Sequence, residues 1–202
     1  TTPGVAYLTR TEDFVAGVMI SASHNPFQDN GLKVFSHEGF KLPDDDEREL
    51  ERRIFALLDQ RLTPESHPLT EDPAFDRHYI QYLAATFQGS LRGVKLVLDC
   101  ANGAASFIGP ELFEKLGAEV IGIGCEPNGR NINLHCGALH VSGLRERVLA
   151  ERADFGAAFD GEADRCIMVS GSGKIIDGDH CMLIVAKDML PAAVVGTVMS
   201  SL

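Results

Sequence analysis

The second half of the chain alternates between apolar strands and amphipathic helices, and this rhythm constrains the fold more than any other feature. Val94 to Asp99 is typical of a strand, a glycine-bearing turn follows, apolar residues then recur on one helical face over 105–116, and a second strand is expected over Val120 to Ile123. The same alternation continues with a helix, two strands and a closing helix, at 144–150, 155–159, 166–169 and 178–189. Such alternation is typical of a parallel sheet covered by helices.

The first half has a less regular pattern. The nearly continuous apolar run from Phe14 to Ala22 predicts a strand covered on both faces. Gly31 to Leu42 predicts a hairpin with a glycine near its turn. Asp44 to Asp59 predicts a helix, because acidic residues crowd its start and the apolar residues fall on one face. A loop at 62–72 and a second helix at about 75–87 complete this half.

The segment Gln88-Gly89-Ser90 marks the expected boundary between two domains, and 202 residues with 45% hydrophobic content suffice for two cores. We predict an α/β protein of two successive α/β units with mixed, largely parallel sheets covered by helices. The first unit would cover 1–88, the second 89–190, and 191–202 would begin a third domain. The chain has no initiating methionine and stops just after an apolar run, so we expect part of a longer protein.

Charge and cysteine usage exclude several classes of partner. A formal net charge of −11 argues against a protein that binds nucleic-acid backbones. No apolar stretch approaches the roughly 18 residues of a membrane span. The five cysteines show no paired spacing and are odd in number, as expected of reduced thiols in a cytoplasmic protein. The sequence leaves a homo-oligomer open.

Three carboxylates follow one of the predicted strands at intervals of two residues. Asp160, Glu162 and Asp164 are separated by small residues that let the backbone curl. Acids this close raise one another's pKa unless a cation lies among them, and Mg²⁺ is favoured because it takes carboxylate and phosphate oxygens together. The EF-hand spacing is absent. An acidic surface turn is the alternative.

A second polar motif ends the strand over Phe14 to Ala22, where Ser23-His24-Asn25-Pro26 follows. These residues fit a capped turn, because serine and asparagine bond to local backbone and proline fixes the bend. They also fit a reactive hydroxyl, although no nucleophile-elbow motif surrounds Ser23. A phosphoryl group on Ser23 would complete the coordination of an ion held by Asp160, Glu162 and Asp164.

With these motifs together, the sequence resembles the α-D-phosphohexomutases, most closely their bacterial branch that acts on glucosamine phosphate. Residues 20–26 look like the phosphoserine loop of that family, 29–33 like the segment that follows it, and 160–165 like its metal loop. Residues 127–133 with Cys136-Gly137 resemble the glucosamine branch. Where this chain has Glu162, the family usually has aspartate, which keeps the charge and shortens the side chain.

The resemblance implies a reaction. Phospho-Ser23 would give its phosphoryl group to a hexosamine 6-phosphate, and the resulting 1,6-bisphosphate would reorient and return the other phosphate. It implies Mg²⁺ as cofactor, with Ser23, Asp160, Glu162 and Asp164 as ligands, and a hexosamine or glucose 1,6-bisphosphate as activator. The implied partner is a phosphosugar. The family has four domains, so this chain alone would be inactive.

Four further residues are expected at this site. Lys33 is the candidate for stabilising the transferring phosphoryl group, or else an ordinary strand lysine. Arg165 orients the carboxylates or grips phosphate, or forms a structural ion pair with Asp160. His24 and Asn25 shape the loop and bond the phosphoserine, and His24 is also a candidate base. The turn at 102–105 fits either a phosphate cradle or a tight strand-to-helix connection.

Other functions remain open on the sequence. A phosphoglucomutase or phosphomannomutase of the same family uses the same motifs. In a haloacid-dehalogenase-like phosphatase Asp160 would be the nucleophile instead, although that class has aspartate where Glu162 stands. A binding or regulatory module without activity is the third alternative.

Overall fold

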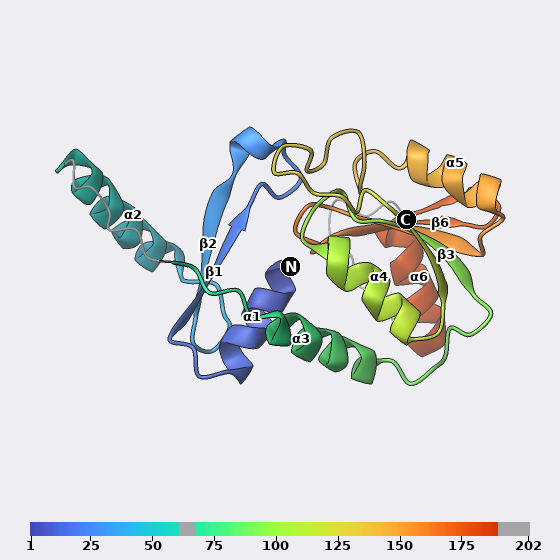
Figure 1. Ribbon diagram of the computed structural model, residues 1–202, viewed down its shortest axis with the longest axis horizontal. Coiled ribbons are helices and arrows are strands. Elements are labelled where there is room, and N and C mark those ends of the chain that lie inside the picture. The colour runs from blue at the N-terminus through green and yellow to red at the C-terminus, as the bar shows by residue number, and fades with distance from the viewer. Residues whose placement is uncertain (61–67, 190–202) are drawn as a thin grey trace. The chain divides into compact units, whose positions relative to one another are not determined.

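The computed structural model describes residues 1–60 and 68–189, which form two compact units (Figure 1). The first unit contains Thr1–Ser21 and Gly31–Thr86, and the second contains Ala22–Asn30 and the described chain from Phe87 onward. Within the described residues, no helix is both long and apolar enough to cross a membrane. The predicted third domain at 191–202 and residues 62–67 of the predicted loop lie outside the described residues.

The first unit is built on a two-stranded antiparallel sheet. Strand β1 (Ala16–Ser21) pairs with β2 (Gly31–Ser36), so that Val18 lies opposite Val34 and Ile20 opposite Leu32. Helix α1 (Thr2–Thr11), which the sequence analysis did not predict, packs against this sheet. Gly17 allows the close approach, because a Cβ on it would lie 2.1 Å from the Thr9 hydroxyl oxygen.

The prediction that the strand over Phe14 to Ala22 is covered on both faces is wrong for the residues that the structure describes. Val18 is 55% exposed and Ile20 is 70% exposed, whereas Gly17 on the opposite face is buried. Alternate residues of a strand point to opposite faces, and α1 packs against one of them. Apolar residues therefore occur on both faces of this strand, although α1 covers only one of them.

The predicted hairpin after Gly31 is present only in part. Strand β2 turns back at Ser36 to Gly39, where Gly39 has a φ of +77° that glycine adopts without strain. The returning arm makes an isolated bridge between Phe35 and Lys41 instead of a full strand. The main partner of β2 is β1, which precedes it in the chain.

Two further helices belong to the first unit. Helix α2 (Asp44–Asp59) has the predicted bounds and four acidic residues in its first turn, where the helix dipole favours negative charge. None of its side chains is fully buried. Helix α3 (Pro73–Thr86) contacts α1 through stacked rings of Tyr7 and Tyr82, whose centroids are 3.9 Å apart.

The second unit contains a five-stranded mixed sheet in the order β4-β3-β5-β6-β7. Strand β3 runs parallel to β4 and β5, while β6 is antiparallel to both β5 and β7. The α/β class and the mixed sheet are thereby confirmed. The bounds are Lys95–Asp99 for β3, Glu119–Ile123 for β4, Phe155–Phe159 for β5, Cys166–Ser170 for β6 and Ile175–Ile176 for β7.

Helices pack on both faces of this sheet, as the alternating sequence pattern predicts. Leu96 and Leu98 of β3 pack with Ala105 of helix α4 (Ala105–Lys115), and Val97 packs with Leu144 of helix α5 (Ser142–Glu151). Helix α6 (Gly178–Met189) follows β7, and a short 3₁₀ helix spans Phe27–Asp29. Because Leu96, Val97 and Leu98 of β3 are completely buried, the loops at its carboxyl end start from a rigid base.

Candidate functional site

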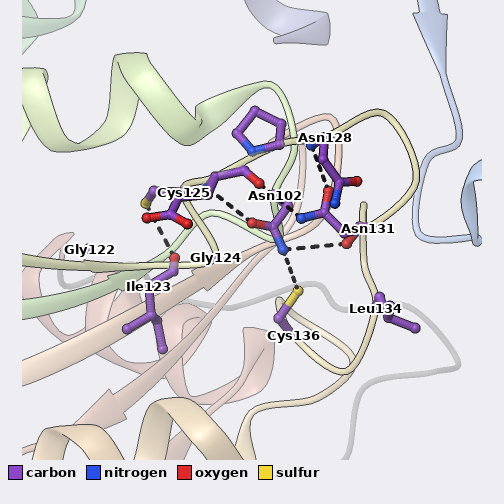
Figure 2. A pocket seen from close by; sticks show the side chains of 11 residues that line it. Asn102, Gly122, Ile123, Gly124, Cys125, Asn128, Asn131, Leu134 and Cys136 are labelled. Carbon is purple, nitrogen blue, oxygen red and sulfur yellow. Dashed lines mark hydrogen bonds between the residues drawn. The ribbon is translucent and has the colours of Figure 1, made fainter.

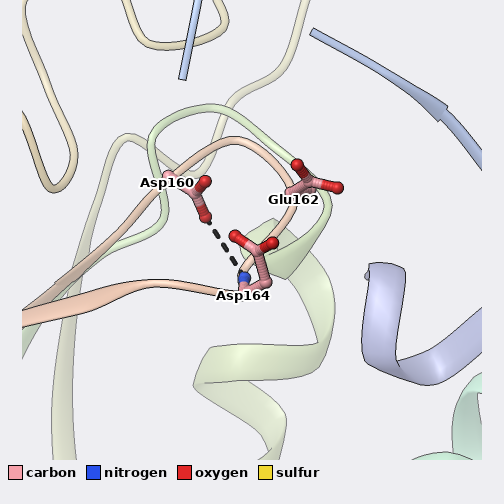
Figure 3. A group of neighbouring side chains, drawn as sticks. All are labelled: Asp160, Glu162 and Asp164. Carbon is pink, nitrogen blue, oxygen red and sulfur yellow. Dashed lines mark hydrogen bonds between the residues drawn. The ribbon is translucent and has the colours of Figure 1, made fainter. Parts of the chain in front are cut away.

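The three predicted carboxylates belong to the loop between β5 and β6. Asp160 is 1% exposed and Glu162 is 0% exposed, while Asp164 is open to solvent. One oxygen from each carboxylate lies within 4.8 Å of the others, and the three side chains project from one curl of backbone (Figure 3). Oxygens bound to one Mg²⁺ at about 2.1 Å lie within about 4.2 Å of one another, so a small contraction would bring these three into coordinating distance.

The surroundings of Asp160 fit a cation. Its Oδ1 accepts hydrogen bonds from the backbone N–H groups of Asp164 (3.2 Å) and Arg165 (3.4 Å), whereas its buried Oδ2 has no hydrogen-bond partner. Burial raises the pKa of Asp160, and the charge of Asp164 raises it further. A buried carboxylate oxygen without a donor is costly, and a bound Mg²⁺ would satisfy it.

Arg165 lies beside the carboxylates. Its Nε is 3.9 Å from Asp160 Oδ2 and 4.0 Å from Asp164 Oδ1, and its side chain is 52% exposed. These distances allow electrostatic attraction but exceed hydrogen-bonding range. The guanidinium therefore partly offsets the negative charge of the loop while its other side stays accessible.

Ser23 lies in the segment 22–30, which groups with the second unit. Its hydroxyl oxygen is 3.2 Å from Nδ1 of His24, within hydrogen-bonding distance. The backbone N–H of Asn25 donates to the carbonyl of Ala22 (2.9 Å), which closes a tight turn. The φ of Ser23 is +52°, a conformation that residues other than glycine rarely adopt.

The serine segment and the acidic loop lie against each other within the second unit. A Cβ on Gly161 would lie 2.8 Å from the Ser23 carbonyl oxygen and 2.6 Å from the side chain of Ile132. Only a glycine therefore fits between Asp160 and Glu162 without displacing the serine segment. Lys33 belongs to the first unit, where it stands on β2 opposite Met19.

The loop after β3 supports the acidic loop from the other side. A Cβ on Gly103 would lie 2.3 Å from the carbonyl oxygen of Gly161, and the N–H of Ala104 donates to that oxygen (2.9 Å). The N–H groups of Asn102 and Gly103 donate to the carbonyls of other residues. With these amides already bonded, the turn at 102–105 corresponds to the tight-connection alternative and not to a phosphate cradle.

Asp99 at the end of β3 joins several of these loops and was not singled out in the sequence. Its carboxylate is buried and accepts hydrogen bonds from the N–H groups of Ala101 (2.9 Å) and Gly137 (2.8 Å). Burial raises its pKa, and the two donors oppose that shift. The only sequence signal was its place at the end of an apolar strand. Asp99 is therefore a structural support of the site.

A cavity of about 730 Å³ lies beside the ends of β3 and β4 (Figure 2). The cavity is lined by residues 102, 122–128, 131, 134 and 136. The side-chain amides of two lining residues already form hydrogen bonds within the protein. Asn102 Nδ2 donates to the Asn131 carbonyl and to Cys136 Sγ, and Asn131 Nδ2 donates to the Glu126 carbonyl. Burial raises the pKa of Cys136 to about 11, so this thiol stays protonated at neutral pH. The described residues that line the cavity include no lysine or arginine, so they provide no cationic side chain for a phosphate.

Comparison with known proteins gives a consistent family. Two profiles described as phosphoglucomutase/phosphomannomutase, alpha/beta/alpha domain I and domain II, match residues 1–61 and 77–173. The chain is 54% identical to the phosphoglucosamine mutase of Solibacter usitatus and 47% identical to that of Aliivibrio fischeri. Each match covers 100% of this chain and 47% of the relative. The chain thus spans about half the length of these curated relatives.

A solved structure agrees with this assignment. The crystal structure of a phosphoglucomutase/phosphomannomutase family protein from Burkholderia thailandensis matches with a TM-score of 0.74 and 26% identity. The match covers 94% of this chain and 42% of that one.

Proposed function

Because the chain belongs to the phosphoglucomutase/phosphomannomutase family, we propose that it carries the reactive serine and the metal loop of a phosphoglucosamine mutase. The complete enzyme would interconvert glucosamine 6-phosphate and glucosamine 1-phosphate. Relatives of that name are 47–54% identical over the whole chain, which favours glucosamine over the sugars used elsewhere in the family. Residues 1–88 would belong to the first domain, 89–190 would form the second, and 191–202 would begin a third.

One observation carries the proposal. The segment with Ser23 lies directly against the acidic loop, in which Asp160 has a buried oxygen without a hydrogen-bond partner. A phosphoryl group on Ser23 would be negatively charged. A cation held by Asp160, Glu162 and Asp164 would be positively charged, so each would neutralise the other. This pairing is what phosphoryl transfer requires, because its catalysis rests on positioning and on neutralising the moving group.

The proposed transfer moves one phosphoryl group and one proton between Ser23 and the sugar phosphate. The bond between phosphorus and Ser23 Oγ breaks, and a bond forms between phosphorus and the free hydroxyl oxygen of the sugar phosphate. The sugar hydroxyl loses its proton and Ser23 Oγ gains one, and the reverse step returns a phosphoryl group to Ser23. Bound Mg²⁺ supplies neutralising charge for the phosphoryl oxygens. The 1,6-bisphosphate formed between the two steps would also serve as activator by rephosphorylating Ser23.

Four further side chains assist the proposed transfer. His24, whose Nδ1 is 3.2 Å from Ser23 Oγ, holds the proton that the serine oxygen gains or loses. Arg165 orients the carboxylates and presents its exposed side to a phosphate oxygen. Asn25 shapes the turn. Lys33 provides a further positive charge for the moving group.

We also place the enzyme in the cytoplasm. All five cysteines are free thiols, as expected in a reducing compartment, and phosphorylated sugars are intracellular metabolites.

The competing phosphatase function needs Asp160 as a nucleophile. Asp160 is 1% exposed, and its Oδ1 already accepts two backbone hydrogen bonds. A substrate phosphorus would have to reach this buried carboxylate. Ser23 is partly exposed, so its hydroxyl is the more accessible oxygen.

The test is made on the full-length protein with Mg²⁺ and glucosamine 1,6-bisphosphate. Intact mass should increase by about 80 Da, and peptide mapping should place an acid-stable phosphate on Ser23. Ser23→Ala should abolish both the label and the mutase activity, whereas Ser21→Ala, a matched change two residues away, should keep both. An acid-labile label on Asp160, or no label on Ser23 under any substrate condition, would contradict the proposal.

A further inference from the structure

The backbone of Ser23 needs an external support. Its φ of +52° lies in the left-handed region, which is unfavourable for residues that carry a Cβ. Such a conformation persists only when surrounding contacts hold it in place, and it is often found at functional sites. The segment from Ala22 to Asn30 forms a turn, closed by the Asn25 N–H to the Ala22 carbonyl, and a short 3₁₀ helix. Contacts from the rest of the second unit add to these local bonds.

Asn133 makes those contacts. Its side-chain amide nitrogen donates to the Ser23 carbonyl at 2.9 Å and to the Asn25 carbonyl at 2.8 Å. Both hydrogens of one amide group are thus used on the two carbonyls that flank His24. These bonds fix the Ser23–His24 and Asn25–Pro26 peptide planes, the first of which contains the carbonyl of the reactive serine. They join positions 110 and 108 residues apart in the chain.

Asn133 is itself held by the sheet. Its backbone N–H donates to the carbonyl of Ala101 (2.9 Å), and the N–H of Ala101 donates to Asp99 Oδ1 (2.9 Å). Asp99 is buried at the end of β3, whose core residues are completely enclosed. A continuous series of hydrogen bonds therefore runs from the rigid sheet through Asn133 to the Ser23 segment.

The residue type at position 133 also follows from its backbone. The φ of Asn133 is +59°, and asparagine tolerates the left-handed region better than most residues with a Cβ. Glycine also tolerates this backbone conformation but has no side-chain amide. Among common residues, asparagine thus combines this backbone conformation with a short donor of two hydrogen bonds.

From this geometry we propose that Asn133 is a positioning residue for phosphoryl transfer, which keeps Ser23 Oγ in the orientation that accepts and releases the phosphoryl group. The inference rests on the proposed function of Ser23. It adds a residue that touches neither metal ligands nor reacting atoms through its amide. The same carbonyl of Ser23 faces Gly161 of the acidic loop, so the amide of Asn133 also fixes the serine against that loop.

The test compares three variants of the full-length protein. Asn133→Gly removes the amide and keeps a residue that adopts positive φ freely. Asn133→Asp places carboxylate oxygens against two carbonyl oxygens. The matched control, Asn131→Asp, makes the same chemical change two residues away, where the amide donates to the Glu126 carbonyl and not to the Ser23 segment.

Two measurements separate positioning from folding. Mutase kinetics with glucosamine 1-phosphate should show kcat lowered about 10- to 100-fold in both Asn133 variants, with KM changed less than about threefold, because a misplaced nucleophile slows transfer more than binding. Hydrogen exchange of residues 22–26, which does not depend on activity, should become faster in both variants. Asn131→Asp should leave kcat and exchange within about twofold of wild type.

The outcomes are distinct. Wild-type kcat in folded Asn133→Gly, or unchanged exchange at 22–26, would overturn the role of Asn133 while leaving Ser23 as the phosphoryl carrier. Absence of phosphate from wild-type Ser23 would overturn the proposed function and the positioning role together. Faster exchange with unchanged kcat would show a structural contact only and would also overturn the proposal.

Discussion

At the scale of single residues, Asp160 has surroundings that a bound cation would stabilise. Its carboxylate is almost fully buried, its Oδ2 lacks a hydrogen-bond partner, and its pKa is raised by burial and by Asp164. A raised folded-state pKa means that, between the ordinary value of 3.8 and the raised one, the folded protein holds a proton that the unfolded chain has released. Without metal, the free energy of unfolding therefore decreases as the pH rises through that interval.

Bound Mg²⁺ would reverse this trend, because it requires the ionised carboxylate. We expect Mg²⁺ at about 100 times its Kd to raise the Tm by about 5–10 °C at neutral pH. The increment should shrink as the pH falls through the raised pKa of Asp160. Thermal melts with and without Mg²⁺ over a pH series measure this effect. Asp160→Asn should show no increment at any pH, and an increment independent of pH in wild type would speak against the assignment.

Glu162 gives a second prediction at this scale. Its side chain is completely buried, and one of its carboxylate oxygens lies within 4.8 Å of an oxygen of Asp160 and of Asp164. Glu162→Gln keeps the size and removes the charge, and it should weaken Mg²⁺ binding at least about tenfold. Isothermal titration with Mg²⁺ provides the measurement. Glu162→Asp, which keeps the charge, should bind Mg²⁺ more tightly than Glu162→Gln, and equal affinities of Glu162→Gln and wild type would refute a ligand role.

Sequence reasoning identifies residues whose chemistry is visible in their spacing. The carboxylates at 160, 162 and 164 stand out because they directly follow an apolar strand and are separated by small residues. Asn133 and Asp99 act through hydrogen bonds to residues distant in the chain, and such partners cannot be read from local patterns. The role of Asn133 becomes visible only when its two carbonyl partners are known.

At the scale of elements, the loops at the carboxyl ends of β3 and β5 are packed too closely for side chains. Gly103→Ala would place a Cβ against the backbone carbonyl of Gly161, at 2.3 Å without movement. Backbone cannot yield as a flexible side chain does, so we expect a loss of about 2–4 kcal/mol in the free energy of unfolding.

Urea denaturation measures this loss, and the chain offers a matched control. Gly143 lies in α5 with nothing within 4 Å of an added Cβ. Gly143→Ala should be neutral or stabilising by up to about 1 kcal/mol, because alanine favours the helix. Equal urea midpoints for the two variants would show that Gly103 and Gly161 are less closely packed than described.

The helices and strands of the second unit could be predicted from local sequence patterns. Helix α1, which depends on contacts with residues distant in the chain, could not. All strands and helices predicted between 94 and 189 are present, because buried strands leave short continuous apolar runs and amphipathic helices leave a period of about 3.6 residues. Helix α1 was missed: Pro3 is compatible with the first turn of a helix, but Gly4 lowers the local helix propensity. Gly4 lets the ring of Tyr79 pack closely against the helix, and no local sequence pattern reveals this contact.

At the scale of the whole molecule, the residues proposed for the reaction are divided between the two units. The second unit contains Ser23 and the acidic loop, whereas Lys33 lies in the first. Sequence predicted two α/β units, but the assignment of 22–30 to the second unit follows from contacts between distant residues such as Asn25 and Asn133. The chain covers 47% of its curated relatives, so full activity is to be tested in the full-length protein.

The most direct test of the account measures whether the phosphoryl group on Ser23 and the acidic loop share one ion. Phosphorus NMR of the Ser23-phosphorylated protein, titrated with Mn²⁺ in place of Mg²⁺, reports this proximity through paramagnetic broadening. We predict that about one equivalent of Mn²⁺ broadens the phosphoserine signal beyond detection in wild type and leaves it sharp in Asp160→Asn. A phosphoserine signal that stays sharp while wild-type protein binds Mn²⁺ would contradict the account.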